Sequence, residues 1–122
     1  MTESTRRIPQ FTYVDQCNAS QLVEVRRSLV EPIAAKYGFC LTYLPFFVSA
    51  ASRALRQCPN VNASLDEDAN EIVLHDRCHI GIATQTRRGL MVPVLHDADQ
   101  MGFAMLAQQL NQLTEDARAG KV

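Results

Sequence analysis

Apolar residues recur at helical spacing in three stretches of the chain, and residues that favour helix ends bound each stretch. The first stretch begins near Asn18-Ala19-Ser20, whose side chains can cap a helix, and Gly38 is suited to end it. Pro32 lacks an N–H and crowds the preceding turn, so we expect a kink or a short restart there. The apolar stripe of this helix consists of Leu22, Val25, Leu29 and Ile33.

The second stretch starts at Thr42, a candidate cap, with Pro45 in the tolerant first turn. Its expected buried stripe is Leu44, Phe47, Val48, Ala51 and Leu55. The third stretch covers about residues 101–117, with Asp99 as a candidate cap and Gly120 as a stop. Its expected buried stripe is Phe103, Leu106, Ala107, Leu110 and Leu113.

Four short segments rich in β-branched or aromatic residues predict strands, at residues 11–14, 72–74, 80–83 and 90–94. Polar or Gly-containing turns separate the last three, which favours antiparallel pairing. Pro93 has no N–H to donate to a neighbouring strand, so the side of the strand where this N–H would point should face a sheet edge, a bulge or another chain. The order of a strand, two helices, three strands and a helix predicts an α+β fold with helices packed on a mainly antiparallel sheet. Residues 1–122 contain no repeat or linker and are expected to form one unit whose last strands are missing.

Composition and charge limit the classes of partner. The 122 residues carry 12 basic and 13 acidic side chains, so no overall field favours nucleic acid or an anionic membrane. No apolar run approaches the roughly 20 residues that span a bilayer, and the start MTESTRRIPQ holds no signal-peptide stretch. We therefore expect a cytoplasmic location. The four cysteines lack a CxxC pair and are expected to be reduced and mostly buried, with disulfides or a zinc site as the less favoured alternative.

Histidines are the first candidates for acid–base chemistry, because only an imidazole titrates near neutral pH without help. His75 and His79 lie in the segment HDRCH, which could form a metal cluster or a Cys/His pair. On a strand, however, these two histidines share one face while Cys78 points to the other. His96 begins HDADQ, where capping and turn formation explain the carboxylates sufficiently. We therefore predict no metal site and assign no catalytic residue.

Arginines are the remaining candidates for ligand contact. Arg87-Arg88-Gly89 places two cations in a tight turn, where they could hold a phosphate or a carboxylate, although exposed turn arginines are commonly just solvated. Arg26 lies opposite the apolar stripe of its helix, so composition alone makes it a surface charge. The chain holds no Gly-rich phosphate loop, GxSxG elbow or HExxH motif.

Several segments, in order along the chain, resemble the dihydrolipoamide acyltransferases of 2-oxo acid dehydrogenase complexes. They are IPQFTY (8–13), LTYLPFF (41–47), CPNVNASLDEDANEIVLH (58–75), HIGIAT (79–84), GLMVPV (89–94) and the stretch from HDADQ to ARAGKV (96–122). The resemblance implies the two-layer sandwich of chloramphenicol acetyltransferase, and trimers that build a larger core, with the active site between subunits. It also implies coenzyme A as a substrate, and a lipoyl group carried on a separate domain rather than on this chain.

The sequence departs from the family at the catalytic groups. In the family, a histidine of an HxxxDG motif deprotonates the attacking thiol and a Ser or Thr hydroxyl stabilises the oxyanion. No HxxxDG occurs in this chain, and the strand that carries the hydroxyl would begin after Val122. The resemblance therefore implies an N-terminal portion of the catalytic domain, with MTESTRRIPQ as the tail of its first helix. Such a portion is expected to be inactive alone and to serve acyl transfer from dihydrolipoamide to coenzyme A only when completed.

Four positions are implied as contacts to coenzyme A. The family's helix arginine matches Arg26 in LVEVR, and the Ser or Thr that opens the next helix matches Thr42 in LTYLP. Gln85 replaces an acidic residue usual after the IGIA strand, and Arg88 is expected to compensate. The segment IPQFTYVDQ looks more like the pyruvate and branched-chain types than the succinyl type.

The implied partners are other copies of the chain, a lipoyl domain and the other components of the dehydrogenase complex, without nucleic acid or membrane. Faces that normally meet the missing half should be exposed, so we expect self-association. The location would be the cytoplasm, or the mitochondrial matrix in a eukaryote. Two alternatives stay open: a non-catalytic assembly or binding module of such a complex, and an unrelated small α+β protein.

Overall fold

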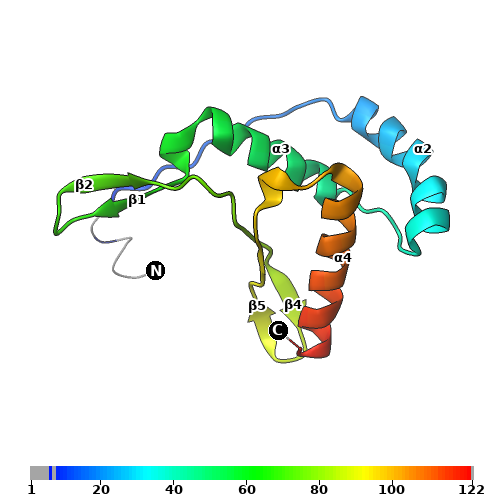
Figure 1. Cartoon of the computed structure of the whole chain (residues 1–122). Helices are drawn as coiled ribbons and strands as arrows, with labels where there is room; N and C mark the ends of the chain where they lie inside the picture. Colours follow the sequence, from blue (N-terminus) through cyan, green and yellow to red (C-terminus); the bar gives the residue numbers. More distant parts are fainter. Residues whose placement is uncertain (1–5, 7, 122) are drawn as a thin grey trace.

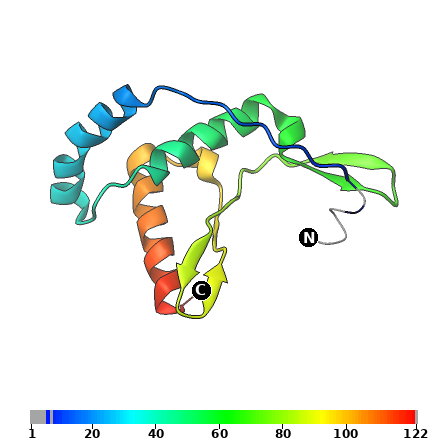
Figure 2. The same cartoon turned by 180° about the vertical axis from the view of Figure 1, so that it is seen from behind.

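The computed structural model describes residue 6 and residues 8–121, and in it two helices precede two β-hairpins and a further helix. In chain order the elements are α2 (Ser20–Tyr37), α3 (Leu44–Gln57), the 3-10 turn η1 (Pro59–Val61), β1 (Ala63–Asp66), β2 (Glu71–Leu74), β3 (Ile80–Gly81), β4 (Thr84–Thr86), β5 (Gly89–Met91), β6 (Val94–Leu95), the 3-10 turn η2 (Ala98–Gln100) and α4 (Phe103–Ala119). Helices α3 and α4 meet at the centre, while α2 and the β1–β2 hairpin extend from them on opposite sides (Figure 1 and Figure 2). All strand pairs are antiparallel, so the predicted α+β class is confirmed.

Helix α2 begins and ends where the sequence predicts. The Asn18 side-chain carbonyl accepts hydrogen bonds from the backbone N–H and the hydroxyl of Ser20, at 3.0 and 2.7 Å, but the N-cap residue is Ala19 and the predicted side-chain cap is not formed. Gly38 closes the helix in the left-handed conformation, with φ 75°, and donates its N–H to the Ala34 carbonyl. This conformation costs glycine little because it has no Cβ.

The interior of α2 differs from the prediction in two ways. The restart expected at Pro32 is wrong, because the helix is continuous from Ser20 to Tyr37. Within the predicted stripe, Ile33 is buried, but Val25 is 48% exposed. The stripe is therefore covered by the rest of the chain only toward the end of the helix.

Helix α3 buries only one residue of the predicted stripe, Val48, fully. Thr42 is not its cap, because Tyr43 occupies the N-cap position with helical φ and ψ and no side chain bonds the first turn. Pro45, Val48 and Ser52 are buried, whereas Leu44, Phe47 and Ala51 of the predicted stripe are exposed. The Ser52 hydroxyl donates to the Ser49 carbonyl at 3.0 Å, which satisfies this polar group in the interior. An apolar face of α3 is thus left open to solvent.

The β1–β2 hairpin projects from the body of the molecule and carries an uncovered apolar surface. Its register pairs Ala63 with Leu74 and Asp66 with Glu71. At its base, the Asn62 side chain donates to the carbonyls of His75 and Arg77, at 3.0 and 3.1 Å. The exposed large apolar residues of the two strands are Leu65, Ile72, Val73 and Leu74. Strand β1 was not predicted, since ASLD lacks the β-branched pattern that marks β2.

Strands β3 to β6 form one long hairpin that Pro93 interrupts. The pairs Gly81 with Val94 and Thr84 with Met91 share one register, so the chain passes Pro93 without a bulge. Pro93 has no N–H to donate, but its carbonyl accepts the N–H of Ile82 at 2.9 Å. The single strand expected at 90–94 is therefore split into β5 and β6. The segment after β3, expected as a turn, forms β4.

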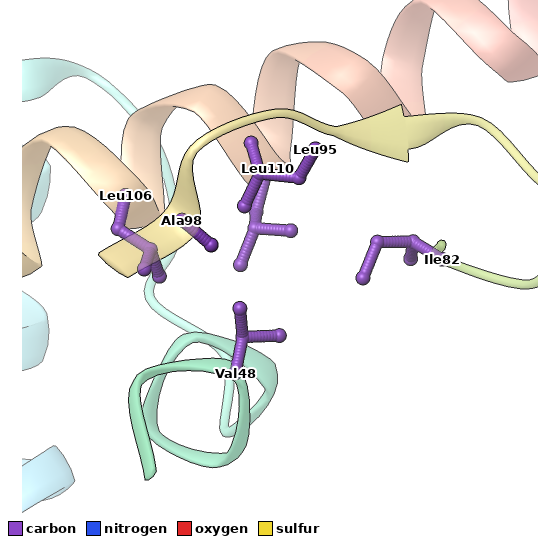
Figure 3. Packing of buried hydrophobic residues seen from close by; sticks show 6 residues of the cluster. All are labelled: Val48, Ile82, Leu95, Ala98, Leu106 and Leu110. Carbon is purple, nitrogen blue, oxygen red and sulfur yellow. The ribbon is translucent and has the colours of Figure 1, made fainter. Parts of the chain in front are cut away.

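Helix α4 buries Leu106, Ala107 and Leu110 of the predicted stripe. In the main cluster, shown in Figure 3, Leu106 and Leu110 of α4 approach Val48 of α3 and the hairpin residues Ile82 and Leu95. The buried residues of this cluster are Val48, Ile82, Leu95, Ala98, Leu106 and Leu110. A second cluster joins Ile33 and Leu41 to Ala107, on another side of α4. The two clusters make α4 the element on which α2, α3 and the long hairpin converge.

The N-terminal end of the described chain does not form the strand expected at 11–14. These residues have no strand neighbour, and Phe11 and Val14 are 91% and 82% exposed. A strand needs a partner for its backbone groups, and the described residues offer none here. The predicted helix tail MTESTRRIPQ lies mostly outside the described residues, which omit 1–5 and 7.

Candidate functional site

Arg26 is not the surface charge that composition indicates. Its Nε donates a hydrogen bond of 2.9 Å to the carbonyl of Leu41, which is fully buried. Its guanidinium carbon lies 4.6 Å from the centroid of the Tyr43 ring, a distance at which a cation is attracted to the ring face. Arg26 therefore contacts both neighbours of Thr42, Leu41 and Tyr43, and holds the segment that leads into α3.

Thr42 lies in the wall of a cavity of about 210 Å³ between α3 and α4. Although its side chain does not cap α3, its exposed hydroxyl remains available to a ligand. The wall is mixed in character, with apolar residues such as Phe39 and Ala107 beside polar ones. Arg118, in the last turn of α4, lines the same cavity.

A second and larger cavity, of about 710 Å³, lies between the β4–β5 turn and the C-terminal end of α4. Its wall includes both other predicted contacts, Gln85 and Arg88, together with Arg87 and Arg118. These residues lie in one wall because the β4–β5 hairpin runs beside the C-terminal end of α4 (Figure 1). A Cβ at Gly120 would lie only 3.9 Å from the Arg88 guanidinium carbon.

The β4–β5 turn is held by its own side chains. The Thr86 hydroxyl donates to the Gly89 carbonyl at 2.8 Å and accepts the Arg88 N–H at 3.1 Å. Gly89 has φ 108°, a conformation that side-chain-bearing residues rarely adopt. The turn therefore holds the backbone that carries Arg88 in one place.

The structure thus brings the predicted ligand residues to two adjoining cavities. Thr42 is in the smaller one and Gln85 and Arg88 are in the larger, while Arg26 lies beside the segment that carries Thr42. Arg118 lines both cavities and was not among the predicted contacts. The only signal for Arg118 in the sequence is its position in the last turn of a predicted helix, and a favourable interaction with the helix dipole explains an arginine there as well as a ligand contact does.

No histidine lines either cavity within residues 6 and 8–121. The predicted strand geometry of HDRCH is wrong, since residues 75–79 form a loop. His75 Nε2 lies 2.7 Å from the Ser64 hydroxyl, and His79 Nδ1 accepts the Asp97 N–H at 3.0 Å. These contacts hold the loop together. The described residues contain no group of His, Cys, Asp and Glu side chains that could hold a metal ion.

An ion pair between the buried carboxylate of Asp99 and the exposed Arg56 lies near this loop and ties η2 to α3. The Asp99 side chain is only 3% exposed, and its Oδ2 accepts hydrogen bonds from Arg56 at 2.9 Å and from Gln100 at 2.7 Å. Burial by itself would raise the pKa of Asp99, but the hydrogen bonds from Gln100 and the backbone, with the charge of Arg56, outweigh it and lower this pKa. Asp99 is therefore a structural carboxylate rather than the predicted cap of α4, a position that Gly102 takes.

All four cysteines are free thiols, as expected, but most of them are not buried. Cys17, Cys40 and Cys58 are exposed, and Cys78 alone is buried. Burial, followed by the nearby negative charge of Asp99, raises the pKa of the Cys78 thiol, which makes it a poor nucleophile. The three exposed cysteines lie in segments outside the helices and strands, before α2, after α2 and after α3, where little of the chain covers them.

The whole chain, residues 1–122, matches the model of the family described as 2-oxoacid dehydrogenases acyltransferase (catalytic domain). This chain therefore belongs to that family. It is 40% identical, over 121 residues, to the lipoamide acyltransferase component of the branched-chain alpha-keto acid dehydrogenase complex of Pseudomonas aeruginosa, covering 99% of this chain and 28% of that protein. It is 37% identical to the dihydrolipoyllysine-residue acetyltransferase component of the pyruvate dehydrogenase complex of Mycobacterium tuberculosis, covering 98% and 22%.

Solved structures agree on the fold. The dihydrolipoamide acetyltransferase of Azotobacter vinelandii superposes with a TM-score of 0.91 at 30% identity, covering 99% of this chain and 49% of that one. The cubic core of a pyruvate dehydrogenase multienzyme complex gives a TM-score of 0.90 at 31% identity, covering 98% and 49%. The chain thus spans about a quarter of the curated relatives and about half of the solved domains. Among the described residues, no helix is long and apolar enough to cross a membrane.

Proposed function

We propose that this chain is the N-terminal portion of the catalytic domain of a dihydrolipoamide acyltransferase, which binds coenzyme A and contributes to acyl transfer from dihydrolipoamide. The observation that carries the proposal is a family match over all 122 residues combined with coverage of only half of the related solved domains. The complete domain would have the chloramphenicol acetyltransferase-like sandwich, in which the missing strands extend the sheet that β3 to β6 begin.

The two cavities support coenzyme A as the ligand. It is a long, anionic molecule, so its binding site needs cations and a groove rather than a closed pocket. The larger cavity supplies Gln85, Arg88 and the neighbouring cations Arg87 and Arg118, and the smaller one supplies Thr42 in a wall that is partly apolar. Arg26 would act chiefly by positioning, because its Nε already bonds the Leu41 carbonyl and only the remaining N–H groups are free for a ligand.

The chain alone is proposed to be catalytically inactive. Thioester exchange at neutral pH needs a base to form the attacking thiolate, and neither cavity offers an imidazole among the described residues. The sequence contains no HxxxDG motif. In the Azotobacter vinelandii relative, the roles of a serine, a histidine and an asparagine in the catalytic mechanism have been investigated, which fits a site completed by residues outside this chain.

The proposed partners follow from the same assignment. They are further copies of the chain in a trimer-based core, a lipoyl domain carried elsewhere, and the other components of a pyruvate or branched-chain type complex, in the cytoplasm or the mitochondrial matrix. The structural match to a cubic multienzyme core supports self-association. Exposed apolar residues on the N-terminal segment and on the β1–β2 hairpin, such as Phe11 and Ile72, supply surface for it.

A binding experiment tests the function directly. We expect coenzyme A to bind the purified chain in isothermal titration, and Arg26→Gln to weaken binding at least about tenfold, as loss of a charge-assisted contact predicts. Arg27→Gln is the matched control, since Arg27 is an exposed neighbour on the same helix and makes neither of the contacts to Leu41 and Tyr43 that Arg26 makes. Absence of binding by the unaltered chain, or equal loss in both variants, would contradict the assignment.

The second candidate is a non-catalytic assembly module, and the exposed apolar surface of the β1–β2 hairpin favours it. Both candidates predict self-association, so sedimentation alone does not separate them. An assembly module would associate through the hairpin without binding coenzyme A. Ile72→Asp should then abolish association, while the catalytic assignment requires coenzyme A binding as well.

A further inference from the structure

Arg118 occupies a place that no other residue of the described chain shares: it lines the cavity at the β4–β5 turn and also the cavity that holds Thr42. It stands on the last turn of α4, and the αL residue Gly120 turns the chain toward Arg88 two residues later. Arg118 is therefore the residue that the walls of the two cavities share. A ligand that extends from one cavity into the other must pass this residue.

The larger cavity concentrates positive charge without neutralising it. Arg87, Arg88 and Arg118 all lie in its wall, and none of the three forms an ion pair within residues 6 and 8–121. Part of this charge is accounted for by the carbonyl end of α4, which favours cations in its last turn. The helix dipole explains the presence of Arg118, but it does not explain why Arg87 and Arg88, from the β4–β5 turn, lie in the same wall.

We propose that Arg118, together with Arg87 and Arg88, binds a phosphate group, and that Arg118 thereby directs the rest of a phosphate-bearing ligand into the cavity of Thr42. A phosphate fits better than a carboxylate because three guanidinium forks offer more donors than one carboxylate accepts, whereas the oxygens of a diphosphate accept several. The larger cavity is the more open one and has three arginines in its wall, whereas the smaller one is lined partly by apolar residues such as Phe39 and Leu44. This difference sets the direction in which the ligand lies. The identity of that ligand as coenzyme A rests on the proposed function, but the phosphate contact does not.

The test uses inorganic pyrophosphate as the probe and the backbone amide signal of Gly120, which lies in the cavity wall, as the local reporter in an NMR titration of the whole chain. We expect saturable movement of this signal in the unaltered chain. Arg118→Gln should raise the half-saturating concentration at least about tenfold, and Arg118→Lys, which keeps the charge but loses the fork, should fall between the two. Arg53→Gln, on an exposed position of α3 outside both cavities, should bind like the unaltered chain. Circular dichroism on each variant excludes loss of fold.

Two results overturn the proposal: no movement at Gly120, or binding of pyrophosphate to Arg118→Gln within about twofold of the unaltered chain. A parallel titration with coenzyme A separates this proposal from the proposed function. If pyrophosphate binds through Arg118 but coenzyme A does not bind, the phosphate site stands and the acyltransferase assignment fails. If coenzyme A binds equally well to Arg118→Gln, the assignment stands and the role of Arg118 is refuted.

Discussion

The buried carboxylate of Asp99 gives the sharpest stability prediction. Asp99→Asn keeps the shape of the side chain but removes its charge and places an amide N–H₂ among groups that already donate. Arg56 and Gln100 both donate to the Asp99 Oδ2, while Oδ1 is buried and the backbone groups that face the carboxylate, at Asp99 and Cys78, are donors as well. Whichever way the new amide is oriented, a buried donor lacks an acceptor.

The expected cost can be worked from these contacts. Loss of a buried hydrogen bond to a charged group, with a donor left unsatisfied, costs about 2–3 kcal/mol. Asp97→Asn is the matched control two residues away, since Asp97 is 37% exposed and its ion pair with Arg77 is long, at 3.4 Å. Such an exposed pair contributes roughly 0.2–1 kcal/mol. The two substitutions should therefore differ by a clear margin in the free energy of unfolding.

Urea denaturation followed by circular dichroism measures both values. The substitutions Asp99→Asn and Arg56→Gln, singly and together, complete a double-mutant cycle, which should yield a coupling of about 1 kcal/mol or more for groups in contact. The reasoning is refuted if Asp99→Asn costs no more than Asp97→Asn. The reasoning is also refuted if the loss of unfolding free energy in the double variant equals the sum of the losses in Asp99→Asn and Arg56→Gln.

Three further predictions follow from single residues. The folded-state pKa of Asp99 is lowered, so the stability that its charge contributes should be complete above its unfolded pKa of about 3.9 and vanish as pH falls through the folded pKa. The difference in free energy of unfolding between the unaltered chain and Asp99→Asn should therefore shrink below about pH 4 and stay constant above about pH 5. Thiol labelling under native conditions should modify three cysteines quickly and Cys78 slowly, and equal rates for all four would contradict its burial and raised pKa. Leu106→Ala, at a side chain only 1% exposed, should lower the free energy of unfolding by about 2–5 kcal/mol, whereas Met105→Ala on the exposed side should cost well under half of that.

The C-terminal ends of α2 and α4 were predictable from the sequence because they depend on local backbone chemistry, whereas the predicted N-terminal caps Thr42 and Asp99 were wrong. Gly38 and Gly120 both adopt the left-handed conformation that ends α2 and α4. The core face of α4 was also predictable, since Leu106 and Leu110 keep a helical period against several elements at once. In these places the local pattern and the tertiary contacts agree.

The buried face of α3 was predictable only in part, because the helix is apolar on more than one side. The sequence favoured Phe47, Val48 and Ala51, but of these the chain buries only Val48, together with Ser52, and leaves Phe47 and Ala51 exposed. A buried serine gives no hydrophobic signal, since its burial depends on a hydrogen bond to the preceding turn. The strand expected at 11–14 failed for a related reason: pairing depends on a neighbour, and local β propensity does not supply one.

The candidate site divides in the same way. Arg26, Thr42, Gln85 and Arg88 were identified through resemblance to a family, and the structure places three of them in cavity walls with Arg26 nearby. Arg118 was missed because its role arises only when the end of α4 meets the β4–β5 turn, about 30 residues earlier in the chain. No periodicity or motif in the sequence records that meeting.

The most direct test of the central claim is acyl transfer by the purified chain itself, measured as acetyl-coenzyme A formed from acetyl-dihydrolipoamide. The chain is expected to bind coenzyme A and yet to form no product above the uncatalysed rate, because loss of a general base and of an oxyanion donor each removes several powers of ten in rate. Turnover by a preparation free of full-length acyltransferase, abolished by replacing His75, His79 or His96, would contradict the account.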